Sequence, residues 1–143
     1  MELIEGESLQ KYAKNTFSKK LPEDDSRFIF KQLVDSVYYI HSLGIVHRDL
    51  KLDNILVTKS RKVKLIDFGF AIEVGVGKKL NVFCGTPSFM SPEIISKVEY
   101  SGPVADVWAL GIVLYYIIVG EFPFRGYNER DLYKKIKSGV YIF

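Results

Sequence analysis

Apolar residues recur every three or four positions through residues 22–44, which is the period of a helix with one buried face. The predicted buried stripe comprises Ile29, Leu33, Val37 and Ile40. Pro22 and the acidic residues after it suit a first helical turn, and Gly44 suits a helix end. A shorter polar segment, residues 8–14, predicts an earlier helix. The first third of the chain is therefore predicted to be helical.

The longest uncharged run of the chain, 14 residues between Asp106 and Glu121, indicates a buried helix. A bilayer span needs about 20 apolar residues, so this run predicts no membrane crossing. We expect a helix over residues 104–119 that is buried on nearly all sides. A final amphipathic helix is expected over residues 129–137. Most of the regular structure is therefore predicted to be helical.

Two short β-rich runs separated by a polar turn predict a hairpin over residues 55–58 and 63–66. If Thr58 pairs with Val63, then Asn54 lies opposite Asp67, and opposed antiparallel side chains are about 5 Å apart. An amide oxygen and a carboxylate are ligands that Mg²⁺ accepts together with nucleotide phosphates. Asn and Asp also favour turns beside strands, so the pair alone fits either a metal site or a turn.

The loop before this hairpin, residues 47–54 (HRDLKLDN), carries an acid, a base and an amide. Asp49 can orient an attacking hydroxyl or accept its proton, and Lys51 can neutralise charge on phosphoryl oxygens. Phosphoryl transfer requires mainly positioning and charge stabilisation from a protein. The loop and the Asn54 and Asp67 pair together predict a phosphoryl-transfer site.

Four motifs occur in the order and spacing of one enzyme family and extend over most of the chain. They are HRDLKLDN at 47–54, Asp67-Phe68-Gly69, Ser91-Pro92-Glu93 and DVWALG at 106–111. Their combination resembles the protein kinase family, with Ser91 in place of the family's alanine. The resemblance implies the large lobe of an α+β kinase fold. This part is mainly α, with a buried central helix and a short hairpin that carries the site.

The resemblance implies ATP and Mg²⁺ as cofactors and gives roles to the residues of the motifs. Asp49 is implied to be the catalytic acid-base residue, Lys51 the phosphate contact, and Asn54 and Asp67 the Mg²⁺ ligands. Lys51, together with Gly85-Thr86-Pro87, is similar to serine/threonine kinases, so a serine or threonine of a protein is the expected acceptor. The run FCGTPSFMSPE resembles the calmodulin-dependent and AMP-activated group.

The resemblance to protein kinases also implies contacts with the adenine of ATP and with the protein substrate. Residues 1–6 resemble the hinge between kinase lobes, with Glu2 and Ile4 facing adenine through their backbone. Leu56 is expected to form the apolar floor under the base. The alternative for residues 1–6 is a strand end. Asp53 predicts a preference for a basic residue upstream of the phosphoacceptor.

The activation segment is expected to use Arg48, Thr86 and Glu93. By resemblance, Thr86 hydrogen-bonds near Asp49 and Lys51; a turn threonine is the alternative. Arg48 receives a phosphate in the family, and Glu93 pairs with an arginine. Residues 70–85 contain no Ser, Thr or Tyr. We therefore hypothesise that activation does not depend on phosphorylation in this segment.

The sequence lacks a glycine-rich phosphate loop, a strand lysine for the α and β phosphates, and a helix glutamate to pair with that lysine. Residues 1–143 are therefore expected to be a partial kinase domain without the small lobe and the C-terminal helices, and inactive alone. A non-catalytic kinase-like module that binds and regulates a partner protein is the alternative function. A small-molecule kinase of related fold is a third, against which the GTPSFMSPE and DVWALG motifs argue.

The composition of the chain excludes some classes of protein and some partners. With 48% hydrophobic and 26% charged residues, disorder is excluded as the main state. The formal net charge of +3 is too small to indicate a nucleic-acid partner. A single cysteine, Cys84, suits a reducing compartment, and the N-terminus has no signal-peptide pattern. These features predict an intracellular protein, cytoplasmic or nuclear.

Overall fold

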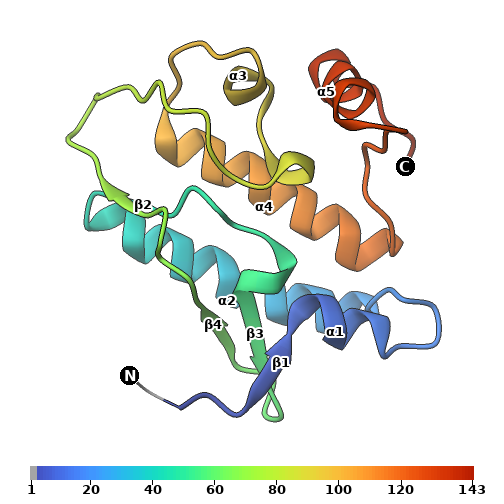
Figure 1. Ribbon diagram of the computed structural model, residues 1–143. Helices are drawn as coiled ribbons and strands as arrows, with labels where there is room; N and C mark the ends of the chain where they lie inside the picture. Colours follow the sequence, from blue (N-terminus) through green and yellow to red (C-terminus); the bar gives the residue numbers. More distant parts are fainter. Residues whose placement is uncertain (1–2) are drawn as a thin grey trace.

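A computed structural model describes residues 3–143 (Figure 1). The helices are α1 (Leu9–Lys14), α2 (Glu23–Ser42), α3 (Pro92–Ile95), α4 (Gly102–Val119) and α5 (Glu129–Ser138). The strands are β1 (Gly6–Ser8), β2 (Ile45–Val46), β3 (Ile55–Thr58), β4 (Val63–Leu65) and β5 (Ile72–Glu73). Two 3₁₀ turns are η1 (Leu52–Asn54) and η2 (Pro87–Phe89). The prediction of a mainly helical α+β fold is confirmed.

The long helix α2 forms as its sequence pattern predicts. It begins directly after Pro22, with three acidic residues in its first turn, where the helix dipole favours negative charge. The four residues of the predicted stripe are buried: Ile29, Leu33, Val37 and Ile40. This buried face packs against α4 and β4. In Figure 1, α4 lies between α2 on one side and α3 and α5 on the other.

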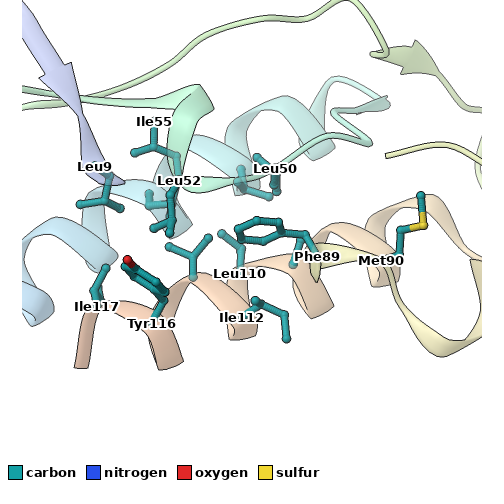
Figure 2. Close-up of a cluster of buried hydrophobic side chains, with 14 of the residues drawn as sticks. Leu9, Leu50, Leu52, Ile55, Phe89, Met90, Leu110, Ile112, Tyr116 and Ile117 are labelled. Carbon is teal, nitrogen blue, oxygen red and sulfur yellow. The ribbon is translucent and has the colours of Figure 1, made fainter. Parts of the chain in front are cut away.

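Helix α4 is the centre of the core, but the expectation that it is buried on nearly all sides is wrong. Val104 and Val107 are 62% and 58% exposed. One broad side is buried, and it includes Leu110, Val113 and Ile117. Figure 2 shows side chains of this helix packing with those of the β1–α1 region, η1 and η2. A run of apolar residues does not by itself show whether a helix is buried on one side or on nearly all sides, because exposed positions also tolerate apolar residues.

By length and composition, α4 is also the one helix among residues 3–143 that could cross a membrane. Its packing against α2 explains the apolar composition without a bilayer. Gly102 starts the helix two residues before the predicted start. A Cβ at Gly102 would lie 2.9 Å from Val46 Cγ2, so the helix approaches β2 closely at its first turn.

The predicted hairpin forms, but its predicted register is wrong by one residue. Strand β3 pairs with β4 so that Val57 lies opposite Val63 and Ile55 opposite Leu65. The turn causes the shift: the Thr58 N–H bonds to the Lys62 carbonyl (2.9 Å), and Arg61 adopts a left-handed conformation (φ 60°). A three-residue loop therefore replaces the assumed four-residue turn.

Two further strand pairings come from segments that lack a strand signal in the sequence. Strand β1 pairs antiparallel with β3 and makes a three-stranded sheet with the order β1-β3-β4. Strand β2 pairs with β5, which follows the motif Asp67-Phe68-Gly69. Each of these three strands has only two or three residues, too few to show a period. The segment 67–93, which shows no sustained period in its sequence, therefore contains β5, η2 and the start of α3.

The two terminal helices form close to the predicted bounds. The Ser8 side chain accepts a hydrogen bond from the Lys11 N–H and caps α1 (3.2 Å). The Asn128 side chain accepts one from the Asp131 N–H and caps α5 (2.9 Å). Gly139, with φ of 67°, ends α5 in the left-handed conformation that favours glycine.

Candidate active site

The loop of residues 47–54 is held by the carboxylate of Asp106, which projects from α4 and is 2% exposed. Its Oδ2 accepts a hydrogen bond from the His47 N–H (2.9 Å), and its Oδ1 accepts one from the Arg48 N–H (3.0 Å). The Nε2 of His41, on α2, lies 2.8 Å from Oδ2. Arg48 adopts a left-handed conformation with φ of 66°. One buried carboxylate therefore fixes the strained start of the loop.

Sequence reasoning missed the roles of Asp106 and His41. The signal for Asp106 was present, because a carboxylate beside the longest apolar run of a chain needs partners if it is buried. His41 gave no such signal, since a histidine in the last turn of a helix is ordinary.

The imidazole of His47 joins the loop to the end of the hairpin and is fully buried. Its Nδ1 accepts a hydrogen bond from the Asp49 N–H (3.2 Å), so Nε2 carries the proton and donates to the Ile66 carbonyl (3.1 Å). The ring also contacts Phe68 edge-on, with 4.9 Å between centroids. His47 therefore supports the site from within the core.

Asp49 lies at the centre of the site and is 6% exposed. Its Oδ1 accepts a hydrogen bond from the Thr86 hydroxyl (2.8 Å). Its Oδ2 accepts one from Asn54 Nδ2 (3.2 Å) and lies 3.5 Å from Lys51 Nζ. The structure therefore brings together Asp49, Lys51, Asn54 and Thr86, which come from one loop and from the segment 37 residues further along the chain.

The amide of Asn54 is oriented by two hydrogen bonds from its Nδ2, one to Asp49 Oδ2 and one to the Asp49 carbonyl (3.0 Å). No residue between 3 and 143 donates a hydrogen bond to the opposite atom, Oδ1. The side chain is 5% exposed, so its orientation is fixed by packing as well. This leaves a hard oxygen atom available to a cation.

Asp67 lies at the same end of the hairpin, but among residues 3–143 its carboxylate forms no hydrogen bond with Asn54 or Asp49. The neighbouring Ile66 N–H bonds to the Asn54 carbonyl (3.0 Å), so Ile66, not Asp67, lies opposite Asn54. Asp67 is exposed, has a left-handed conformation (φ 58°), and accepts a hydrogen bond from the Gly69 N–H (3.2 Å). The shorter hairpin turn displaces it by one residue from the predicted position.

The donor set of Asn54 and Asp67 fits Mg²⁺, because it consists of an amide oxygen and an exposed carboxylate. Within residues 3–143 no three His, Cys, Asp or Glu side chains gather to hold a metal by themselves. A cation bound by Asn54 and Asp67 would therefore need further ligands, such as the oxygens of nucleotide phosphates and water.

Two of the three residues predicted to contact adenine are described, and Glu2 lies outside the described residues. Leu56 in β3 is half-buried and pairs with Ser8 of β1, and Ile4 is half-buried just before β1. Strand β1 begins at Gly6, the last residue of the segment 1–6, so the hinge and the strand-end interpretations both stay predictions.

Arg48 and Glu93 are not paired with a charged group in the described part of the chain. The Arg48 side chain donates through Nε to the Phe70 carbonyl (2.6 Å). Glu93 is exposed in the short helix α3, and no residue from 3 to 143 bonds to its carboxylate. The predicted roles of Arg48 in phosphate binding and of Glu93 in ion pairing stay predictions.

A family model described as the protein kinase domain matches residues 1–143. The chain belongs to the protein kinase domain family. It is 48% identical over 141 residues, or 99% of the chain, to sperm motility kinase 2B of Mus musculus. It is 46% identical over 122 residues, or 85% of the chain, to NUAK family SNF1-like kinase 2 of Rattus norvegicus.

The chain spans only part of the length of these relatives. It covers 29% of sperm motility kinase 2B and 19% of the rat protein. A human relative, NUAK family SNF1-like kinase 1, is 43% identical over 123 residues and is also covered to 19%. The region that this kinase-domain chain shares with all three includes the loop around Asp49.

Proposed function

We propose that this kinase domain is part of a serine/threonine protein kinase that transfers the γ-phosphoryl group of ATP to a protein hydroxyl, with Mg²⁺ bound. The observation that carries the proposal is the set of three contacts on the Asp49 carboxylate, from Thr86, Asn54 and Lys51. Both oxygens of the Asp49 carboxylate accept hydrogen bonds, and the Lys51 ammonium lies beside it. Asp67, an exposed carboxylate that suits a metal ion, lies at the end of the neighbouring hairpin. This arrangement is suited to phosphoryl transfer. The names of the relatives, all of which are kinases, support the same class.

In the proposed reaction, Asp49 orients the acceptor hydroxyl and takes its proton as the new P–O bond forms, while the bond from the γ-phosphorus to the β,γ-bridging oxygen breaks and ADP leaves. Thr86 and Asn54 hold the carboxylate in a fixed orientation, so little reorganisation is needed when the acceptor arrives. The Lys51 side chain is 25% exposed and its Nζ lies 3.5 Å from Asp49 Oδ2, so the ammonium can neutralise charge on phosphoryl oxygens transferred beside Asp49. Asn54 and Asp67 would hold Mg²⁺, which neutralises phosphate charge when bound.

The lysine at position 51 also supports the choice of acceptor. Its ammonium and the Thr86 hydroxyl approach different oxygens of Asp49, so Thr86 and Lys51 flank the place where an acceptor hydroxyl would bind. The similarity of Lys51, together with Gly85-Thr86-Pro87, to serine/threonine kinases supports serine or threonine as the acceptor.

The acceptor is tested with the longest natural chain that contains these residues. It is incubated with ATP, Mg²⁺ and three peptides that differ only in having Ser, Thr or Tyr at the central position. We expect transfer to the Ser and Thr peptides and little to the Tyr peptide. A second set, with Arg, Ala or Glu upstream of the acceptor, tests the preference for a basic residue that exposed Asp53 predicts. Transfer to the Tyr peptide alone would contradict the proposal.

A further inference from the structure

Tyr100 binds the segment that carries Thr86 at two separate points. Its backbone N–H and carbonyl form an isolated antiparallel bridge with Leu80, in which both hydrogen bonds are 2.8 Å. Its phenol hydroxyl donates a third hydrogen bond to the carbonyl of Val82, also 2.8 Å. The ring is 4% exposed, so Tyr100 lies beneath the segment.

These contacts are close in sequence to Thr86, the residue that binds the catalytic carboxylate. Four peptide bonds separate Val82 from Thr86, whose hydroxyl donates to Asp49. Between them, Gly85 has φ of +115°, and a Cβ there would lie 3.1 Å from the Arg48 carbonyl. The segment therefore passes against the catalytic loop in a conformation that favours glycine. Because so few residues separate them, a shift of residues 80–82 would displace Thr86.

Phe83 provides an additional anchor next to the hydrogen bond of Val82. Its ring lies under the Lys97 ammonium (5.5 Å to the centroid) and contacts the Tyr133 ring edge-on (6.3 Å between centroids). Residues 70–85 contain no hydroxyl that could be phosphorylated. Arg48 donates to the Phe70 carbonyl. The segment is thus held by a tyrosine hydroxyl, a strand bridge and ring contacts, all of which form without a phosphate.

We propose that Tyr100 is a positioning residue that holds residues 80–86 against the catalytic loop and so replaces the need for a phosphorylated residue in this segment. This inference rests on the proposed kinase function for its effect on turnover. Packing alone does not explain the choice of tyrosine, because a phenylalanine would fill the same space without bonding to Val82. Burial, with a smaller contribution from Cys84, raises the pKa of Tyr100, and Arg48 lowers it by less. A phenol is protonated at neutral pH in either case, so the hydroxyl can donate to Val82.

The test replaces Tyr100 by phenylalanine in the longest natural chain that contains residues 1–143, which removes the hydroxyl and keeps the ring. Amide hydrogen exchange of Leu80, whose N–H donates to the Tyr100 carbonyl, is the first measurement. We expect exchange there to become about three- to tenfold faster, because the bridge between Leu80 and Tyr100 loses the support of the neighbouring hydroxyl bond to Val82. The matched control is Tyr38→Phe, at a tyrosine that is 75% exposed on α2, and it leaves exchange of the segment unchanged. Unchanged exchange in Tyr100→Phe would overturn the proposal.

Steady-state kinetics of the same variants form the second measurement. We expect Tyr100→Phe to lower kcat toward a peptide acceptor several-fold, with an unchanged KM for ATP and a melting temperature like that of Tyr38→Phe. Faster exchange with unchanged kcat would overturn the positioning role. A wild-type chain without kinase activity would overturn the proposed function, and the exchange measurement would still report on the Tyr100 contact.

Discussion

Replacing Asp49 by asparagine is expected to lower kcat by about 10²–10⁴-fold, the range typical for loss of a general acid-base group. The amide has nearly the shape of the carboxylate but cannot accept the proton of the attacking hydroxyl. The hydrogen bond from Thr86 to Oδ1 can persist, since the amide oxygen also accepts. The other oxygen becomes an NH2 group that faces Asn54 Nδ2 and the Lys51 ammonium, so we expect a loss of stability of about 1–3 kcal/mol. Steady-state kinetics with Mg²⁺, ATP and a Ser peptide provide the measurement.

The matched control for Asp49→Asn is Asp24→Asn, the same change at an exposed carboxylate in the first turn of α2. It is expected to leave kcat as in the wild type. If Asp49→Asn kept most of the wild-type kcat, then Asp49 would not take the proton. The contacts of Thr86 and Asn54 with it would then need a purely structural explanation.

Replacing Asp106 by alanine is expected to lower the free energy of unfolding by about 3–5 kcal/mol, the cost of breaking a buried charged pairing. The carboxylate accepts hydrogen bonds from the N–H groups of His47 and Arg48 and contacts His41. Its removal leaves these buried donors without an acceptor, and each unsatisfied group costs about 1–3 kcal/mol. The measurement is urea unfolding of the full chain, followed by circular dichroism.

Asp35→Ala is the control for Asp106→Ala. Asp35 is 64% exposed and forms a helix-surface ion pair with Lys31, which typically contributes about 0.3–0.5 kcal/mol. A loss of stability in Asp106→Ala no larger than in Asp35→Ala would contradict the assignment of Asp106 as the anchor of the catalytic loop.

The fold was predictable from sequence where many residues share one period. Helix α2 has a buried stripe over most of its length and clear end signals, so its bounds and its buried face were both predicted. The hairpin was predictable from two β-rich runs. Its register was not, because it depends on the left-handed conformation of one turn residue, Arg61, and sequence gives little warning of a positive φ outside Gly, Asn and Asp.

Contacts between distant segments were the least predictable. Strands β1, β2 and β5 are too short to show alternation, and each is a strand because of its pairing, β1 with β3 and β2 with β5. The bridge between Leu80 and Tyr100 is of the same kind. The contact of Thr86 with Asp49 was expected only by resemblance, since no local pattern brings Thr86 to a residue 37 positions away.

Nucleotide binding by the full chain tests most directly whether Asn54 and Asp67 together hold Mg²⁺ and ATP beside Asp49. Calorimetric titration of ATP with and without Mg²⁺ compares the wild type with Asp67→Asn. We predict that Mg²⁺ strengthens ATP binding at least about tenfold in the wild type, equivalent to about 1.4 kcal/mol, and that Asp67→Asn removes this gain. Equal Mg²⁺ dependence in both proteins, or none in the wild type, would contradict the account.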